Sequence, residues 1–279
     1  GQHPVLEGNS ELELDVPVDR WLKEYATPQL KDGGDVERAP TLRELLCHRS
    51  GIYSQRDKLT RNQNRWMRDF QLTLKESVNG IAQEPLKSAP GALFAYSGAA
   101  YCVLGRVAEV ATGMPVETLL QQHVCRPLQL VRTTYFPHGT YSNIAAGHHV
   151  DQDQLKISAS TPHLLGKRQR FALIGGSIYS PARELARFAA MLLDEGKFEK
   201  QVVLSRKSWQ EMTTTQSERS TGPYGFGLGL RHDAQSNELV AFSHGGSLSG
   251  FISYVVVDLS TRRFAVINYT GPRQKAITS

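Results

Sequence analysis

Long apolar runs are absent from the chain, and cysteines are few. No stretch of 18 consecutive apolar residues occurs in the 279 residues, which predicts that no helix spans a membrane. The cysteines are Cys47, Cys102 and Cys125, and at least two of them fall in stretches with the pattern of an amphipathic helix. We expect free, mostly buried thiols, with one disulfide as the alternative. The cysteines therefore leave the redox compartment and the localisation open.

A strong excess of one charge is also missing. The 32 Lys and Arg residues and the 27 Asp and Glu residues leave a net charge of +5. The densest basic cluster, Lys167, Arg168 and Arg170, is small, and we interpret it as a solvated loop. Because no concentrated basic face is present, nucleic acid is not an expected partner. The hydrophobic content of 40% excludes a disordered or fibrous chain.

The common serine-nucleophile patterns are missing as well. No serine or threonine is followed by a lysine three positions later, and no serine lies in a Gly-x-Ser-x-Gly segment. The nearest approaches are Ser54 with Lys58 and Ser205 with Lys207, at spacings of four and two residues. At neither spacing do the two side chains share a helical turn in the way that a serine and a lysine three positions apart do. Ser50, Ser97, Ser180 and Ser243 are better explained as caps or turn residues.

Periodicity predicts helices through the first two thirds of the chain and strands at its end. A capping box formed by Thr41 and Glu44 opens a short helix, and apolar spacing predicts a second helix from Ala99 to Gly113. Further helices are expected between Pro115 and Pro127, after Ser180-Pro181, and in part of 54–80. The segment 11–18 is expected to be extended. Strands are predicted at 239–242, 251–258 and 264–269, and their short connections favour an antiparallel meander.

Two short segments carry candidate chemistry. Tyr96 lies in a loop directly before a predicted helix, where a nearby cation that lowered its pKa would make the phenol a proton acceptor; the alternative is a structural loop tyrosine. The segment His244-Gly245-Gly246-Ser247 follows a predicted strand. Its glycines leave a bare backbone edge for an acyl group, and the N–H of Ser247 is a candidate oxyanion donor. A glycine-rich turn between strands explains the same segment equally well.

A metal site is a competing interpretation. His148, His149, Asp151 and Asp153 place four candidate ligands in one short stretch. Adjacent histidines on an extended segment point to opposite sides, and no His-Glu-x-x-His helix accompanies them. We therefore expect neither a metal nor another cofactor.

Seven segments occur in the order of a known family. They are Thr41-Leu-Arg-Glu-Leu-Leu-Cys-His-Arg-Ser-Gly-Ile52, Pro90-Gly-Ala-Leu-Phe-Ala-Tyr-Ser-Gly98, Gly105-Arg-Val-Ala-Glu109 with Thr112-Gly113, Arg126-Pro-Leu-Gln-Leu130 with Thr133-Thr134, Gly175-Gly-Ser-Ile-Tyr-Ser180, Tyr224-Gly-Phe-Gly-Leu-Gly229 and His244-Gly-Gly246. Together they resemble the class C β-lactamase, D-alanyl-D-alanine carboxypeptidase and esterase family, over roughly residues 5 to 270.

The resemblance implies a fold and a site. The fold is α+β and β-lactamase/transpeptidase-like, an antiparallel sheet flanked by helices plus a helical domain. We place a mostly helical part at 1–170 and an α/β part with the C-terminal strands at 171–279. In such enzymes the serine of a Ser-x-x-Lys segment is acylated. By resemblance Tyr96 moves protons, while Gly98, His244, Gly245, Gly246 and Ser247 contact the substrate and its oxyanion.

The departures from the family pattern shape the expected function. Gly98 stands where Asn is usual, which removes an amide that would bind a substrate carbonyl and makes esters more plausible than β-lactams or peptides. The missing Ser-x-x-Lys suggests a chain without its nucleophile helix and truncated at both ends. We therefore predict a serine hydrolase of small acyl compounds whose 279-residue chain is inactive by itself. The alternative is a non-catalytic binding or interaction protein. The oligomeric state stays open.

Overall fold

The computed structural model of the chain describes residues 12–137, 144–158 and 169–271. Its helical elements, all within those ranges, are η1 (Val18–Arg20), η2 (Lys23–Tyr25), α1 (Leu42–Leu46), α2 (Arg61–Arg68), α3 (Leu74–Ala82), α4 (Gly98–Thr112), α5 (Val116–Leu120), the π-helical η3 (Gln121–Cys125), α6 (Ala182–Leu193) and α7 (Arg206–Thr213). The predicted helices correspond to α1 to α6. The predicted extended segment is wrong in part, because it contains a turn and enters η1 at Val18.

The strands form one large sheet and two short hairpins. The hairpins pair β1 (His148–Asp151) with β2 (Gln154–Ile157), and β3 (Lys197–Phe198) with β4 (Gln201–Val202). The large sheet has six antiparallel strands in the order β10-β9-β8-β7-β6-β5. Its strands are β5 (Ser217–Arg219), β6 (Gly222–Tyr224), β7 (Gly229–His232), β8 (Leu239–Leu248), β9 (Phe251–Asp258) and β10 (Arg263–Thr270). The predicted antiparallel meander is therefore confirmed.

Local sequence explains where the first helices begin and end. The hydroxyl of Thr41 accepts from the N–H of Glu44, whose carboxylate accepts from the N–H of Thr41, so the predicted capping box closes the first turn of α1. Ser97 caps α4 with a single hydrogen bond, in which its hydroxyl accepts from the N–H of Ala100. Gly113 ends α4 in a left-handed conformation, with φ of 69°, which glycine adopts without a steric penalty.

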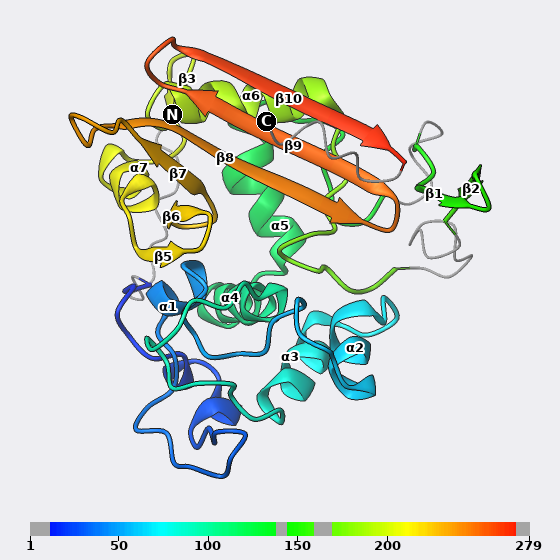
Figure 1. Cartoon of the computed structure of the whole chain (residues 1–279), viewed down its shortest axis with the longest axis vertical. Helices are drawn as coiled ribbons and strands as arrows, with labels where there is room; N and C mark the ends of the chain where they lie inside the picture. Colours follow the sequence, from blue (N-terminus) through cyan, green and yellow to red (C-terminus); the bar gives the residue numbers. More distant parts are fainter. Residues whose placement is uncertain (1–11, 138–143, 159–168, 272–279) are drawn as a thin grey trace.

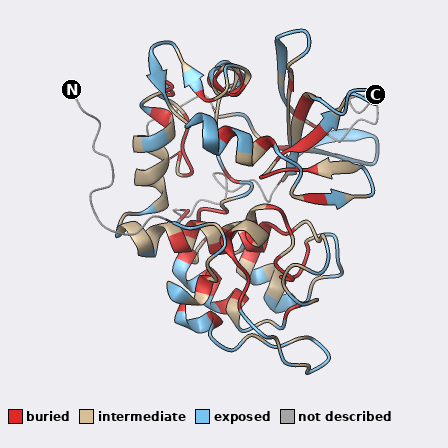
Figure 2. Ribbon diagram, turned by 90° about the vertical axis from the view of Figure 1, so that its left-hand side faces the viewer, coloured by how far each residue is buried: buried red, intermediate tan, exposed pale blue. Residues whose placement is uncertain are grey.

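The helices α1 to α4 fill one half of the molecule and the six-stranded sheet fills the other, with α6 packed on β9 and β10 (Figure 1). Each half has its own apolar cluster. One gathers residues of α1, α3 and α4 around Leu45, Val78 and Val103. The other joins α6 and α7 to the sheet around Leu192 and Phe242. Buried residues lie on the inward sides of the helices (Figure 2). The division at residue 170 remains a prediction.

None of the helices in the described part of the chain is long and apolar enough to cross a membrane. The three cysteines are free and buried: Cys47 follows α1, Cys102 lies in α4 and Cys125 ends η3. The predicted free thiols are therefore confirmed.

Candidate active site

Tyr96 lies immediately before the start of α4, as the sequence predicts. Ser97 is the N-cap of that helix, so the phenol of Tyr96 is placed at the end where the helix dipole is positive. Two hydrogen bonds join this loop to the segment 53–54. The hydroxyl of Ser54 donates to the carbonyl of Tyr96 at 2.6 Å, and the hydroxyl of Ser97 donates to the carbonyl of Tyr53 at 2.8 Å. These two bonds hold the chain at Tyr96 and Ser97 against the segment 53–54.

The segment from His244 to Ser247 lies within a strand and not after one. It continues β8, and its residues pair in register with Val255, Tyr254, Ser253 and Ile252 of β9. The glycine-rich turn proposed for it is therefore wrong. The actual turn is Ser249-Gly250, where φ values of 50° and 82° define a type I′ hairpin. At Gly245 a Cβ atom would lie only 3.1 Å from the ring of Tyr254, which favours glycine within the strand.

One edge of β8 is free in the second half of that strand. The pairing of β7 with β8 stops at Gly229 and Ser243, and no other described strand continues it. Leu248 and Phe251 flank the two-residue turn, so the alternation of the antiparallel ladder directs the N–H groups of Ser247 and Gly245 away from β9. Gly245, Gly246 and Ser247 are exposed. This edge has the geometry expected for binding an extended acyl group.

Tyr96 and His244 come together from the two halves of the molecule. The phenol Oη of Tyr96 lies 3.2 Å from Nε2 of His244, and the two rings are stacked with centroids 6.2 Å apart. Burial lowers the pKa of His244, and Arg219 lowers it further, so the imidazole is neutral at pH 7. Burial raises the pKa of Tyr96, and the guanidinium groups of Arg56 and Arg219 oppose that rise only in part. The net effect is a raised pKa, so the arginines do not bring the pKa of Tyr96 below its ordinary value.

His48 is a buried residue of the site to which the sequence analysis assigned no role. Its Nδ1 accepts from the N–H of Ser97 at 3.1 Å, and its carbonyl accepts from the N–H of Ala95 at 2.8 Å. Its ring lies 4.2 Å from that of Tyr96, centroid to centroid. Burial, with smaller effects of His244 and two arginines, lowers the pKa of His48 to about 3. His48 is therefore a neutral acceptor that holds the residues on both sides of Tyr96.

Gly98 is buried at the first position of α4. Its N–H donates to Oε1 of Gln55 at 2.6 Å, so the side-chain amide of Gln55 lies beside the start of α4. A Cβ atom on Gly98 would come within 2.9 Å of the terminal methyl of Met67. Contact between Gly98 and a substrate remains a prediction.

Two arginines flank the pair formed by Tyr96 and His244. The guanidinium carbon of Arg56 lies 5.6 Å from the centroid of the Tyr96 ring. That of Arg219 lies 4.9 Å from the centroid of Tyr224, whose buried hydroxyl has no hydrogen-bond partner among the described residues. The sequence analysis assigned no role to His48 or Tyr224, and their only signal was their position inside two of the family-like segments. The arginines and Gln55 carried none.

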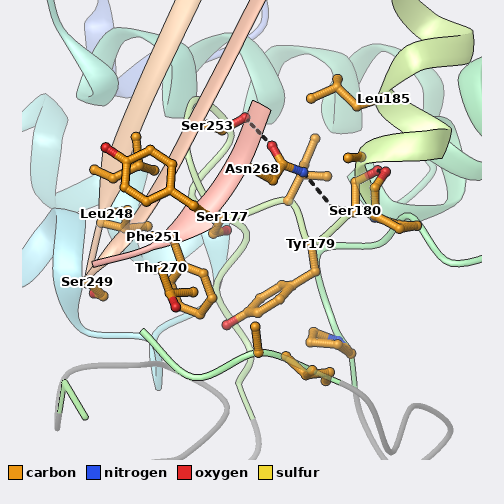
Figure 3. A pocket seen from close by; sticks show the side chains of 18 of the residues that line it. Ser177, Tyr179, Ser180, Leu185, Leu248, Ser249, Phe251, Ser253, Asn268 and Thr270 are labelled. Atoms are coloured by element: carbon orange, nitrogen blue, oxygen red, sulfur yellow. Dashed lines mark hydrogen bonds between the residues drawn. The ribbon is translucent and has the colours of Figure 1, made fainter. Parts of the chain in front are cut away.

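A separate cavity of about 610 Å³ lies between the start of α6 and the sheet. It is bordered by the segment Ser177 to Ser180 and by the facing ends of β8, β9 and β10. Asn268 accepts from the hydroxyl of Ser253 and donates to the carbonyl of Ser180 on its wall (Figure 3). None of the six predicted site residues lines this cavity.

The competing metal-site residues have other contacts. Nδ1 of His148 lies 3.0 Å from the hydroxyl of Thr270, and Asp151 pairs with Lys156 at 2.7 Å. Among the residues that the structure describes, no three His, Cys, Asp or Glu side chains gather to hold a metal.

The chain is similar to esterases and penicillin-binding proteins. The family model described as Beta-lactamase matches residues 5–276. The esterase EstB of Burkholderia gladioli is 39% identical over 131 residues, which are 44% of this chain and 32% of the esterase. Penicillin-binding protein 4 of Amycolatopsis lactamdurans is 26% identical over 193 residues, 67% of this chain and 45% of that protein. Each match thus spans less than half of the relative.

Solved structures show the same fold. EstCE1, a hydrolase with promiscuous acyltransferase activity, superimposes with a TM-score of 0.74 at 23% identity, covering 93% of this chain and 73% of that one. A penicillin-binding protein from Bacillus halodurans gives 0.72 at 18% identity, covering 94% and 75%. The chain belongs to the Beta-lactamase family, and its fold is the α+β fold of the penicillin-binding proteins and β-lactamases.

Proposed function

We propose that the chain belongs to a serine acyl hydrolase that acts on small acyl compounds and favours esters over β-lactams and peptides. The observation that carries the proposal is the contact of Tyr96 with His244 beside the free edge of β8. The edge binds the acyl group, and the N–H of Ser247 donates to the oxyanion. His244 orients the substrate or supports Tyr96.

Tyr96 carries the proton in this proposal. As a phenolate it takes the proton of the attacking serine hydroxyl, and as the resulting phenol it returns that proton to the leaving alkoxide of the ester. The imidazole of His244 is neutral in both protonation states of Tyr96. Its Nε2 accepts from the phenol hydroxyl in one tautomer and donates to the phenolate oxygen in the other. Gly98 supports the preference for esters, because it lacks the side-chain amide that would bind the carbonyl of a peptide or β-lactam side chain.

The 279 residues contain no Ser-x-x-Lys segment that would supply the nucleophile, so we propose that this chain has no turnover by itself. The same observation favours a second candidate function, a non-catalytic relative that keeps the site to bind an acyl ligand. Neither candidate requires a metal or another cofactor.

The test compares three samples on p-nitrophenyl butyrate and a chromogenic cephalosporin. They are the protein encoded by the complete gene, its Tyr96→Phe variant and the 279-residue chain. We expect ester hydrolysis by the first, a loss of about 100-fold or more in kcat for the second, and none for the third. Turnover that survives Tyr96→Phe would contradict the role of Tyr96. If the complete gene product hydrolyses neither compound, the binding protein is favoured.

A further inference from the structure

The charges around Tyr96 lead to one further inference. The titratable groups that face its phenol come from six segments of the chain. They are His244 from β8, His48 from the segment after α1, Tyr101 from α4, Tyr224 from β6, Arg219 from β5 and Arg56 from the loop before α2. No Asp or Glu contributes to the shift in the pKa of Tyr96. Whatever negative charge the phenol develops must therefore be balanced by groups in this set.

The two imidazoles carry no positive charge at pH 7 that could balance the phenolate. Burial lowers the pKa of both His48 and His244, so both rings are neutral there. The buried phenols of Tyr101 and Tyr224 are neutral as well, because burial raises the pKa of each. Arg56 and Arg219 are then the only formal charges among the described groups that face Tyr96.

Both guanidinium groups are available to act on Tyr96. Neither forms an ion pair with a carboxylate within the described residues. Asp57, the neighbour of Arg56 in sequence, is held by Lys87 at 2.8 Å. Arg56 lies over the Tyr96 ring, and a ring that loses its proton attracts a cation over its face more strongly.

Arg219 is fixed where its charge reaches the site. Its Nε donates to the carbonyl of Gly222 at 3.2 Å, and its guanidinium packs over Tyr224. Gly229 leaves the room that this guanidinium occupies, because a Cβ atom there would collide with it. The ring of Tyr224 lies 5.4 Å from that of His48, which in turn contacts Tyr96. Arg219 thus lowers the pKa of Tyr96 from a half-buried position beside Tyr224.

We propose that Arg56 and Arg219 stabilise the Tyr96 phenolate while this tyrosine transfers a proton. The role rests on the proposed function. The burial that raises the pKa of Tyr96 makes such stabilisation necessary, since an unassisted buried phenolate would be too rare to act as a base. One proton is transferred in total. The phenolate takes it from the attacking hydroxyl and gives it to the leaving group, and the arginines keep their protons throughout.

The proposal is tested on the 279-residue chain, without any need for turnover. All ten tyrosines are replaced by 3-fluorotyrosine, whose more acidic phenol titrates under milder conditions, and the titration is followed by fluorine NMR. The resonance of residue 96 is assigned by its loss in Tyr96→Phe. We expect Arg56→Met and Arg219→Met each to raise the pKa of this phenol by about 0.5 or more. Arg56→Lys should restore it, and salt at about 1 M should reduce the effect of Arg56→Met by screening.

Arg206→Met is the matched control, because Arg206 is an exposed arginine at the start of α7 that pairs with Glu195. It should leave the titration of residue 96 unchanged. If Arg219→Met fails to fold, Arg219→Lys and the salt series take its place, since lysine keeps the charge and should leave the pKa of residue 96 at the value of the parent chain. An unchanged titration in folded Arg56→Met, or an equal shift in Arg206→Met, would overturn the proposal. Either result leaves the hydrolase assignment standing, because that assignment is decided by turnover.

Discussion

Tyr96 and His244 lie 148 residues apart in the chain, yet the phenol oxygen of one is 3.2 Å from an imidazole nitrogen of the other. Tyr96 comes from the start of a helix in one half of the molecule, and His244 from the central strand of the sheet in the other. Their contact therefore links the two halves at the candidate site, and the predictions below begin with it.

The contact should be measurable as a coupling free energy. In a double-mutant cycle of Tyr96→Phe and His244→Ala, we expect the two changes in unfolding free energy to be non-additive by about 0.5 to 1.5 kcal/mol. Urea unfolding of the four proteins provides the measurement. His123→Ala, on an exposed residue of η3, replaces the second mutation in a control cycle that should be additive. Additivity in the first cycle would mean that the hydrogen bond does not form in solution.

Buried His48 should make stability fall in acid. Its pKa is about 3 in the folded protein and about 6.5 in the unfolded chain, so between these values the unfolded state binds more protons. The stabilisation is complete above pH 6.5 and is lost as the pH falls toward 3, by up to about 1.4 kcal/mol per pH unit. His244 contributes in the same direction, because its pKa is also lowered.

Urea unfolding at a series of pH values tests this dependence. His48→Asn should flatten the curve below pH 6.5 and lower the stability at pH 7. His123→Gln, on an exposed histidine, should leave the shape of the curve unchanged. A His48→Asn protein whose stability falls with acid as steeply as that of the parent would contradict the assignment of a neutral buried imidazole.

Gly98 should tolerate asparagine at a modest cost. Because a Cβ atom there would press on the terminal methyl of Met67, which ends a flexible side chain, we expect Gly98→Asn to lower the unfolding free energy by about 1 kcal/mol. Gly113→Asn is the matched control, since nothing lies within 4 Å of the added atom and asparagine tolerates a left-handed backbone. Equal costs for the two changes in thermal unfolding would show that the space around Gly98 adapts.

The carboxylate of Glu184 should stabilise the segment 131–133, part of which borders the cavity. Glu184 is only 2% exposed, and it accepts from the N–H groups of Val131 and Arg132 and from the hydroxyl of Thr133. Glu184→Gln directs an N–H₂ group at donors, so we expect a loss of about 2 to 4 kcal/mol. Glu195→Gln, on a half-exposed carboxylate, should cost less than about 1 kcal/mol in the same urea titration.

Local patterns predicted most of the helices and the long strands. The capping box at Thr41, the apolar spacing after Ala99 and the stop at Gly113 are signals within one element, and the structure contains that element at each place. The strand predicted at 251–258 coincides with β9. The antiparallel order followed from connections too short for a crossover. In each case the information lies within a few residues of the element, which is why one sequence sufficed.

Elements with a fainter sequence pattern were not predicted. Helix α7 is polar and buries only Trp209 and Thr213, so its apolar pattern is faint. Strands β5 and β6 have three residues each, and Gly222 and Pro223 lie within β6. The strand conformation of His244 to Ser247 is decided by pairing with β9, which outweighs the low strand propensity of two glycines.

By itself, the sequence determined the family-like segments, the antiparallel meander of the last three strands and the two segments that carry Tyr96 and His244. Only the tertiary structure showed that these two side chains touch, that His48 holds the Tyr96 loop, and that Arg56 and Arg219 face the same phenol. The physical reason is that burial and the distances between charges depend on how the two halves pack. The pKa values follow from both, and no local pattern encodes them.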